Sequence, residues 1–299
     1  MPGALTVGEV LGRSTRWLAE RGSPSARLDA EVLIAAALGI RRLDLYLAPE
    51  RPLADDERDR LRELVRRRGA GEPIAYIRGT REFYGLDFAV TPAVLIPRPE
   101  TEVLVDEVLA RLATLEAPAP AIADVGTGSG AIACAIALRD PRVRVVATDA
   151  SAAAIEVARR NVAAHGLEAR VEIRCCDLLD AVPREPCLDA VVSNPPYVAD
   201  DEAGLLDASV REFEPHSALF AGPDGMSVTR RLVEEAVPRL RRGAPLVVEV
   251  GTPAQAARVE ALLLGTPGLC DVHALPDAAG VVRGYAAVRT SSPNPDGAP

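Results

Sequence analysis

The chain contains no lysine, so all 34 of its basic residues are arginines. It has five cysteines but no C-x-x-C pair, which argues against a disulfide framework and against a zinc site. The three histidines are scattered, so we expect packing or surface roles for them. No apolar run approaches the roughly 20 residues of a membrane-spanning helix. We therefore expect a cytoplasmic protein that needs no metal and does not contact a membrane.

The acidic residues are concentrated in the later part of the chain. Residues 1–98 carry a net charge of +2, whereas residues 99–299 carry -11. An acidic main body disfavours a broad electrostatic grip on duplex nucleic acid. A cluster of arginines could bind RNA locally, but interleaved acids favour an ordinary solvated helix face there. The arginines of this cluster are Arg58, Arg60, Arg62, Arg66, Arg67 and Arg68.

The apolar spacing divides the chain into four segments. Residues 1–75 show helical spacing with glycine stops, which predicts a small helical domain that recognises the substrate. Residues 76–98 alternate apolar and polar side chains, which predicts a connector with a β-hairpin. From 99 to 290 a helix is followed by strands that alternate with helices, which predicts an α/β domain with a mostly parallel sheet. The polar tail 291–299 is expected to be disordered.

A glycine-rich turn follows the first strand of the α/β domain. The strand at 121–125 runs into Asp124-Val125-Gly126-Thr127-Gly128-Ser129-Gly130 and then into a helix. Glycines in such a turn let the backbone approach a ligand closely. The spacing is G-x-G-x-G rather than the dinucleotide fingerprint, and no Gly-Lys-Ser/Thr of a phosphate loop follows. The turn is therefore a candidate site for a nucleoside rather than for a phosphate.

Two further strand ends support a nucleoside site. The second strand ends in Asp149, whose carboxylate can accept hydrogen bonds from ribose hydroxyls. The third ends in Asp177-Leu178, where an adenine would lie. Ordinary turns with surface acids remain the alternative explanation of each feature taken alone.

The fourth strand ends in Asn194-Pro195-Pro196-Tyr197. The prolines fix the backbone, so the Asn194 side-chain oxygen and the Pro195 carbonyl can accept both N–H bonds of one NH2 group. Tyr197 would provide a flat wall for a planar amide or a base. A simple strand-ending turn is the alternative. With the nucleoside site beside it, the segment favours N-methylation by an S-adenosylmethionine-dependent enzyme.

The motifs of the chain resemble those of the bacterial protein-(glutamine-N5) methyltransferases of peptide chain release factors. The resemblance covers about residues 5–289 and is carried by GEPIAYIRGTREFYG, LIPRPETE, DVGTGSG, SNPPY, FEPHSALFAGPDG and EVG. It implies a class I methyltransferase fold, with a Rossmann-like seven-stranded, mostly parallel sheet, a small all-helical N-terminal domain and a linking β-hairpin. It also implies that the acceptor is the glutamine of the Gly-Gly-Gln motif in class I release factors. We expect a monomer that does not act directly on DNA.

The resemblance also assigns roles to individual residues. S-adenosylmethionine would be bound by Asp124, Gly126, Thr127, Gly128, Ser129, Gly130, Asp149, Asp177, Leu178 and Asn194. The acceptor glutamine would be bound by Asn194, Pro195, Pro196 and Tyr197, with Arg98, Pro99 and Glu100 lining or bracing the site. Family members can carry an aromatic residue where this chain has Leu178.

Two other functions are compatible with these motifs. A DNA or RNA adenine or guanine N-methyltransferase could hold an exocyclic amine at the same segment, with Tyr197 stacked on the base. The acidic charge and the lack of a recognition domain disfavour it. A non-enzymatic module that binds the ribosome or a release factor is the second alternative, which the intact glycine turn and Asp149 disfavour.

Overall fold

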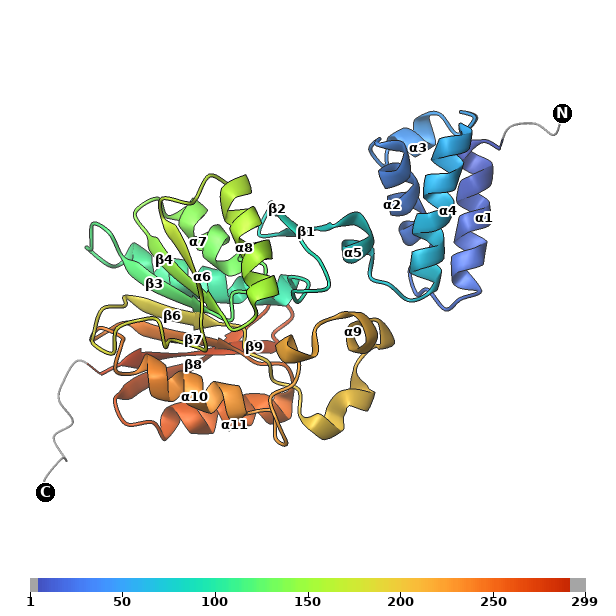
Figure 1. Cartoon of the computed structure of the whole chain (residues 1–299). Coiled ribbons are helices and arrows are strands. Elements are labelled where there is room, and N and C mark those ends of the chain that lie inside the picture. The colour runs from blue at the N-terminus through green and yellow to red at the C-terminus, as the bar shows by residue number, and fades with distance from the viewer. Residues whose placement is uncertain (1–4, 291–299) are drawn as a thin grey trace, which may run out of the picture. The chain divides into compact units, whose positions relative to one another are not determined.

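A computed structural model describes residues 5–290 and divides them into two compact units (Figure 1). The first unit contains the residues up to Thr80 together with 207–213, and the second contains 81–206 and the residues from Glu214 onward. The predicted disordered tail, 291–299, lies outside the described residues. The assignment of separate roles to 1–75, 76–98 and 99–290 stays a prediction.

The first unit is helical, as the sequence predicts. Its helices are α1 (Val7–Ala19), α2 (Ala26–Leu38), α3 (Asp44–Leu47), α4 (Asp55–Gly69), α5 (Ile74–Arg78) and α9 (Ala208–Phe213). Helix α1 begins with a reciprocal capping box between Thr6 and Glu9, and α2 ends at Gly39 in the left-handed conformation. Fully buried Leu18, Leu33 and Ile34 belong to its core. Helix α5 was not predicted, and its five residues lie on both sides of the predicted boundary between 1–75 and 76–98.

The arginine cluster of α4 is neutralised by acids within the first unit. Each of its six arginines forms an ion pair, and the partners, in chain order, are Asp55, Asp56, Asp59, Glu63, Glu72 and Asp29. The prediction of a solvated, charge-balanced helix face is therefore preferred to an RNA-binding strip.

The second unit is built on a sheet of seven strands and confirms the predicted α/β fold (Figure 1). The strand order is β5-β4-β3-β6-β7-β9-β8, and only β9 runs antiparallel to its neighbours. The strands are β3 (Ala121–Val125), β4 (Arg144–Asp149), β5 (Val171–Cys175), β6 (Ala190–Ser193), β7 (Pro245–Glu249), β8 (Leu269–Pro276) and β9 (Val282–Arg289). A separate hairpin pairs β1 (Thr80–Phe83) with β2 (Leu86–Ala89), as predicted.

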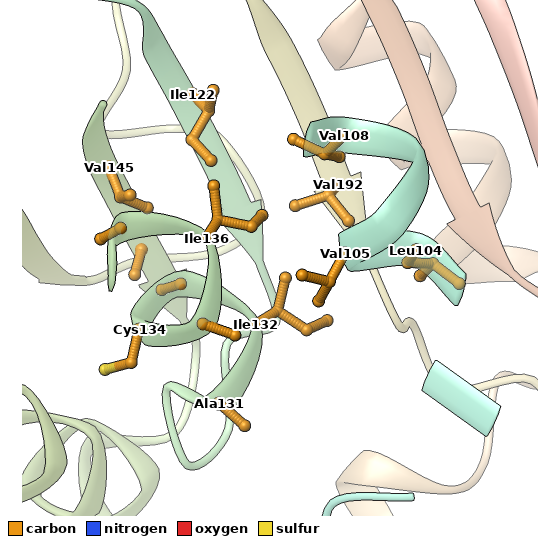
Figure 2. Packing of buried hydrophobic residues seen from close by; sticks show 14 of the residues in the cluster. Leu104, Val105, Val108, Ile122, Ala131, Ile132, Cys134, Ile136, Val145 and Val192 are labelled. Carbon is orange, nitrogen blue, oxygen red and sulfur yellow. The ribbon is translucent and has the colours of Figure 1, made fainter. Parts of the chain in front are cut away.

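Helices cover both faces of this sheet, because alternate strand residues point to opposite sides. Ile122 packs into one core with α6 (Glu102–Ala113), α7 (Ala131–Arg139) and α8 (Ala152–Ala164). Its neighbour Ala123 packs into the other core with α10 (Ser227–Ala236) and α11 (Pro253–Leu264). Figure 2 shows Ile132 and Ile136 of α7 within the first core. Burial of α7 among strands and helices fixes the turn that precedes it.

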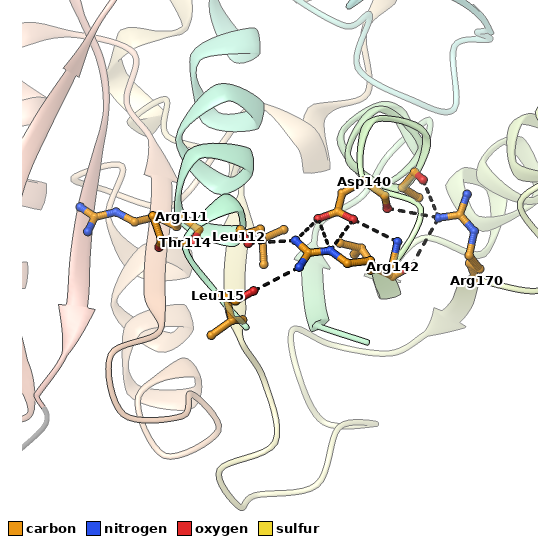
Figure 3. A network of polar contacts seen from close by, with 9 residues as sticks. Arg111, Leu112, Thr114, Leu115, Asp140, Arg142 and Arg170 are labelled. Carbon is orange, nitrogen blue, oxygen red and sulfur yellow. Dashed lines mark hydrogen bonds and ion pairs between the residues drawn. The ribbon is translucent and has the colours of Figure 1, made fainter. Parts of the chain in front are cut away.

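The far end of α7 is held by a polar network (Figure 3). The Arg142 guanidinium pairs with Asp140 and donates to the carbonyl oxygens of Leu112 at 3.0 Å and Leu115 at 3.1 Å. Its hydrogen bonds to Asp140 lower the pKa of that carboxyl. The network ties the end of α6 to the turn between α7 and β4, so α7 is anchored at the end opposite the glycine turn.

Three short 3-10 helices complete the second unit: η1 (Pro99–Thr101), η2 (Asp200–Leu205) and η3 (His216–Ala218). Among residues 5–290, no helix is long and apolar enough to cross a membrane.

Candidate functional site

The candidate site lies where the order of strands in the sheet changes direction. The chain proceeds from β3 through β4 to β5 on one side and continues with β6 and β7 on the other. Strands β3 and β6 are paired side by side, and the Ser193 hydroxyl donates to the Val125 carbonyl oxygen at 2.7 Å. Ligands of such sheets bind beyond the carboxyl ends of the strands at this switch point.

A cavity of about 430 Å³ opens at this place. Of the residues that the sequence assigns to the site, those that line it are Arg98, Gly126, Thr127, Ser129, Asp149, Asp177, Leu178, Asn194 and Pro196. The other assigned residues do not line it: Pro99, Glu100, Asp124, Gly128, Gly130, Pro195 and Tyr197. The turns after four successive strands thus meet at one cavity, although they are distant in the sequence.

The glycine turn has the backbone that its sequence predicts. Gly126, Gly128 and Gly130 have φ values of +72°, +54° and +79°, a region that side chains disfavour. The N–H groups of Gly126 and Thr127 donate to the Thr148 carbonyl oxygen at 2.8 and 2.9 Å. The turn is therefore fixed against β4 and presents its outer surface to the cavity.

Asp124 lies behind this turn. It is fully buried, and its Oδ2 accepts hydrogen bonds from the Thr127 hydroxyl at 2.6 Å and from the Ala133 N–H at 3.1 Å. Burial raises the pKa of Asp124 to about 7, although these hydrogen bonds oppose the shift and the charge of Asp149 adds to it. Asp124 thus braces the turn and the start of α7 from the inside.

Asp149 ends β4 and faces the cavity. Its Oδ2 accepts from the Gly128 N–H at 2.9 Å and its Oδ1 accepts from the Ser151 N–H at 2.8 Å. Burial raises the pKa of Asp149, and the two backbone hydrogen bonds oppose that rise. Each carboxylate oxygen keeps a second lone pair, so this oriented group can still accept hydrogen bonds from a ligand.

The turn after β5 contributes Asp177 and Leu178. Leu178 is mostly buried and has a φ of +41°, which is rare for a residue other than glycine. Asp177 accepts a hydrogen bond from Arg231 at 2.7 Å in a half-exposed ion pair. Leu178 therefore offers the cavity an apolar surface, whereas the Asp177 charge is already paired at the rim.

The segment after β6 is held by two glycines. A Cβ on Gly251 would lie 2.2 Å from the Tyr197 ring, and a Cβ on Gly225 would lie 2.2 Å from the Tyr197 carbonyl oxygen. The Tyr197 and Val198 N–H groups both donate to the Leu219 carbonyl oxygen, at 3.1 and 2.8 Å. Burial raises the pKa of Tyr197 to about 12, so it is a neutral phenol at ordinary pH. Tyr197 is thus tightly enclosed but does not line the cavity.

Three residues at the site were missed by the sequence assignment. Glu214 is buried and pairs with Arg98, and it also accepts from the Ile96 N–H at 3.1 Å. Thr101 is buried, and its Oγ1 lies 3.4 Å from the Nδ2 of Asn194, a residue of the predicted acceptor site. Glu249 is buried at the end of β7. A carboxylate that closes an otherwise apolar strand, as in Leu246-Val247-Val248-Glu249, was the available signal for the third.

Within the part of the chain that the structure describes, no group of three or more His, Cys, Asp or Glu residues is placed to hold a metal ion.

Comparisons with known proteins agree with this geometry. A family model described as the PrmC N-terminal domain matches residues 9–79, and one described as the methyltransferase small domain matches residues 101–213. The release factor glutamine methyltransferase of Rhodopirellula baltica is 41% identical over 279 residues, which is 92% of this chain and 93% of that protein. The one of Moorella thermoacetica is 44% identical over 285 residues, which is 95% of this chain and 99% of that protein.

A solved structure shows the same fold. The hMettl16 catalytic domain matches with a TM-score of 0.53 at 16% identity, over 71% of this chain and 77% of that one. The fold is thus that of the class I methyltransferases, and the similarity to relatives over nearly the whole chain decides the family. This chain belongs to the release factor glutamine methyltransferases.

Proposed function

We propose that this enzyme transfers a methyl group from S-adenosylmethionine to the side-chain amide nitrogen (N5) of the glutamine in the Gly-Gly-Gln motif of class I release factors. The observation that supports this most is the meeting of the glycine turn, Asp149 and Asn194 at one cavity of the switch point. The sequence predicts each of these three elements on its own, and the family relationship explains them together as parts of one methyltransferase site.

The residues present fit the cofactor. The turn 126–130 contributes Gly126, Thr127 and Ser129 to the cavity lining, and Asp149 supplies a carboxylate for ribose hydroxyls. Leu178 and Ile132 form an apolar part of the cavity wall, against which a purine could pack. When bound, S-adenosylmethionine supplies a methyl group on a positively charged sulfur. Asp124 would act indirectly, by holding the turn in shape.

The acceptor would be held by Asn194 and Pro195. Two acceptors, the Asn194 side-chain oxygen and the Pro195 carbonyl, match the two N–H bonds of a primary amide. Holding both N–H bonds orients the amide nitrogen, and alignment of this kind can contribute about 7–11 kcal/mol in favourable cases. Asn194 lines the cavity, whereas Pro195 is buried beside it.

Transfer to nucleic acid is the rival that the site chemistry permits. An exocyclic base amine also has two N–H bonds, so the experiment must offer both kinds of acceptor together. We expect labelled S-adenosylmethionine to mark the release factor in a mixture with tRNA and duplex DNA. Label on either nucleic acid, or on none of the three, would contradict the proposed function.

Replacement of Asp149 with asparagine is expected to weaken cofactor binding by about 1–3 kcal/mol. The carboxylate accepts hydrogen bonds from Gly128 and Ser151 through different oxygens, and an amide would set an NH2 group against one of these N–H donors. Calorimetric titration with S-adenosylhomocysteine measures the change. The matched control is Asp59→Asn, an exposed aspartate of α4 that pairs with Arg62 and does not line the cavity, and it should alter affinity by less than about threefold. Equal effects of the two variants would refute the ribose assignment of Asp149.

Residues 1–75 are proposed to recognise the release factor without taking part in the chemistry. A glutamine side chain offers little surface, whereas a standard protein interface buries about 800 Å² per partner. The second unit has its own two hydrophobic cores, so it should fold when these residues are deleted. The kcat/KM on intact release factor is expected to fall by about a hundredfold or more, in line with the loss of a small interface.

A Gly-Gly-Gln peptide is the control substrate for this deletion. Its slow methylation should be almost unchanged, because a short peptide would not reach the missing helices. Equal losses on peptide and protein would instead place residues 1–75 in the catalytic site or in its folding. An unchanged rate on both would place recognition entirely in the rest of the chain.

A further inference from the structure

Asn161 is a buried polar residue of α8 that the proposed reaction does not use. It is only 1% exposed, and its buried neighbours on α8 include the apolar residues Ile155 and Val162. A side-chain amide in such a place costs free energy unless its donors and its acceptor are bonded. Asn161 meets this condition through three hydrogen bonds, which reach two segments that are distant in the sequence.

The first of these segments is the end of the hairpin strand β2. Asn161 Oδ1 accepts from the Ala89 N–H at 2.8 Å, and Asn161 Nδ2 donates to the Ala89 carbonyl oxygen at 2.9 Å. The side chain thus pairs with both backbone polar groups of Ala89, as a neighbouring antiparallel strand would. Further along the chain, His165 Nε2 lies 3.1 Å from the Asp87 carbonyl oxygen, and the His165 ring packs against Phe88. The hairpin is therefore held against α8 at two places.

The second segment is the glycine turn. Asn161 Nδ2 also donates to the Ser129 carbonyl oxygen, at 2.7 Å. Ser129 lines the cavity, and the peptide that follows it leads into Gly130, whose φ is +79°. Because glycine allows a wide range of backbone angles, a peptide beside it needs a partner to fix its orientation. The hydrogen bond from Asn161 supplies such a partner at the wall of the cavity.

Donor and acceptor chemistry allows only one orientation of this amide. Its NH2 group has two hydrogens and faces two carbonyl oxygens, whereas its oxygen faces one N–H. A rotated amide would set its oxygen against both carbonyl oxygens and its NH2 group against the N–H. Asn161 therefore bonds to the hairpin and to the glycine turn at the same time.

We propose that Asn161 is a positioning residue that couples the cofactor site to the hairpin, because it holds the Ser129 carbonyl and the Ala89 backbone together. The inference rests on the proposed function for the identity of the cofactor. After Ala89 the chain runs into Ala93 and Leu95, which line the same cavity. Asn161 thus joins two parts of one cavity wall. A cofactor that makes the turn more rigid should also make the hairpin more rigid, and linkage requires the reverse as well.

The Asn161→Asp variant separates the two contacts. Aspartate keeps an oxygen that can accept from the Ala89 N–H, but it has no NH2 group for the Ser129 carbonyl. Calorimetric affinity for S-adenosylhomocysteine should fall by about tenfold or more. The KM for S-adenosylmethionine should rise in step, whereas kcat at saturating cofactor should stay within about threefold, since Asn161 does not touch the reacting atoms. Unchanged affinity in the folded variant would overturn the proposal.

Two further variants control for the hairpin and for the buried charge. His165→Ala removes the exposed contact with Asp87 and leaves the Ser129 carbonyl in its hydrogen bond, so affinity should change by less than about threefold. Asn161→Ala adds no charge and should lose as much affinity as Asn161→Asp. Equal losses in His165→Ala and Asn161→Asp would assign the effect to the hairpin in general, and the proposal would fail.

Hydrogen exchange tests the coupling in the natural protein, without any substitution. Saturation with S-adenosylhomocysteine should slow exchange of the Ala89 amide by about fivefold or more, and this response should be absent from Asn161→Asp. Strand β8, at the edge of the sheet opposite β5, is the internal control. Equal slowing in β8 would mean general stabilisation and would overturn the coupling.

The same experiment distinguishes this inference from the proposed function. If the natural protein does not bind S-adenosylhomocysteine, the proposed function and the inference fall together. Normal binding with an Ala89 amide that does not respond overturns the inference alone.

Discussion

Replacement of Asn194 with alanine is expected to abolish most turnover while weakening cofactor binding far less. Alanine removes one of the two oxygens that would orient the acceptor amide, and the loss should cost about 1–3 kcal/mol or more in the transition state. This corresponds to a fall in the single-turnover rate of about 5- to 150-fold. Among residues 5–290 the Asn194 side chain makes a single hydrogen bond, to Thr101, so its loss should disturb the fold little.

Asn194→Asp is the matched variant for this experiment, because aspartate keeps an accepting oxygen at the same place. It should retain more activity than Asn194→Ala, although aspartate lacks the NH2 group that Asn194 donates to Thr101, which will make it less active than the natural enzyme. Calorimetry with S-adenosylhomocysteine checks that both variants still bind the cofactor. A natural turnover rate in Asn194→Ala would refute the role of this residue.

Replacement of Gly251 with alanine is expected to be almost as damaging, although Gly251 does not line the cavity. The new Cβ would lie 2.2 Å from Tyr197 Cε2, 2.5 Å from Cδ2 and 2.8 Å from Cζ, so the ring must move. The Tyr197 backbone has no room to move away, because Gly225 packs closely against its carbonyl oxygen. The neighbouring prolines also make the segment stiff. A shift of about 1 Å at a catalytic segment can lower the rate by about a hundredfold.

Two controls show whether this effect passes through Tyr197. Gly204→Ala adds the same methyl group at an exposed glycine with nothing within 4 Å, and its activity should be normal. In a Tyr197→Ala background the added effect of Gly251→Ala should almost vanish, because the clashing ring is gone. Additive losses in kcat/KM would mean that Gly251 acts elsewhere, and a collapse of the melting temperature would indicate damage to the fold instead.

The regular part of the fold was predictable because its signals are local. Buried strands such as β3 and β6 are short apolar runs, and helices such as α2 end at a glycine. The short helices α5, α9 and η3 were missed, because helices of this length are marginal alone and depend on tertiary packing. Strand β8 begins at Leu269 and has a register shift between Cys270 and His273, an irregularity that no local pattern signals.

The parts of the site that follow strands were predictable for a similar reason. A parallel sheet brings its carboxyl ends to one edge, so Asp149 and Asn194 could be expected near the glycine turn. The contacts that tune these residues were not predictable. Thr101 lies beside Asn194 although the two residues are 93 positions apart in the sequence. Their contact depends on side-chain packing between η1 and the end of β6, which no local pattern encodes.

The most direct test of the account is the position of the new methyl group on a class I release factor. After incubation with S-adenosylmethionine and the natural enzyme, fragmentation mass spectrometry should place one added methyl on the glutamine of the Gly-Gly-Gln peptide. The same reaction with Asn194→Ala should leave that peptide almost unmodified under single-turnover conditions. Methylation of any other residue, or an unmodified glutamine after prolonged reaction with cofactor-binding natural enzyme, would contradict it.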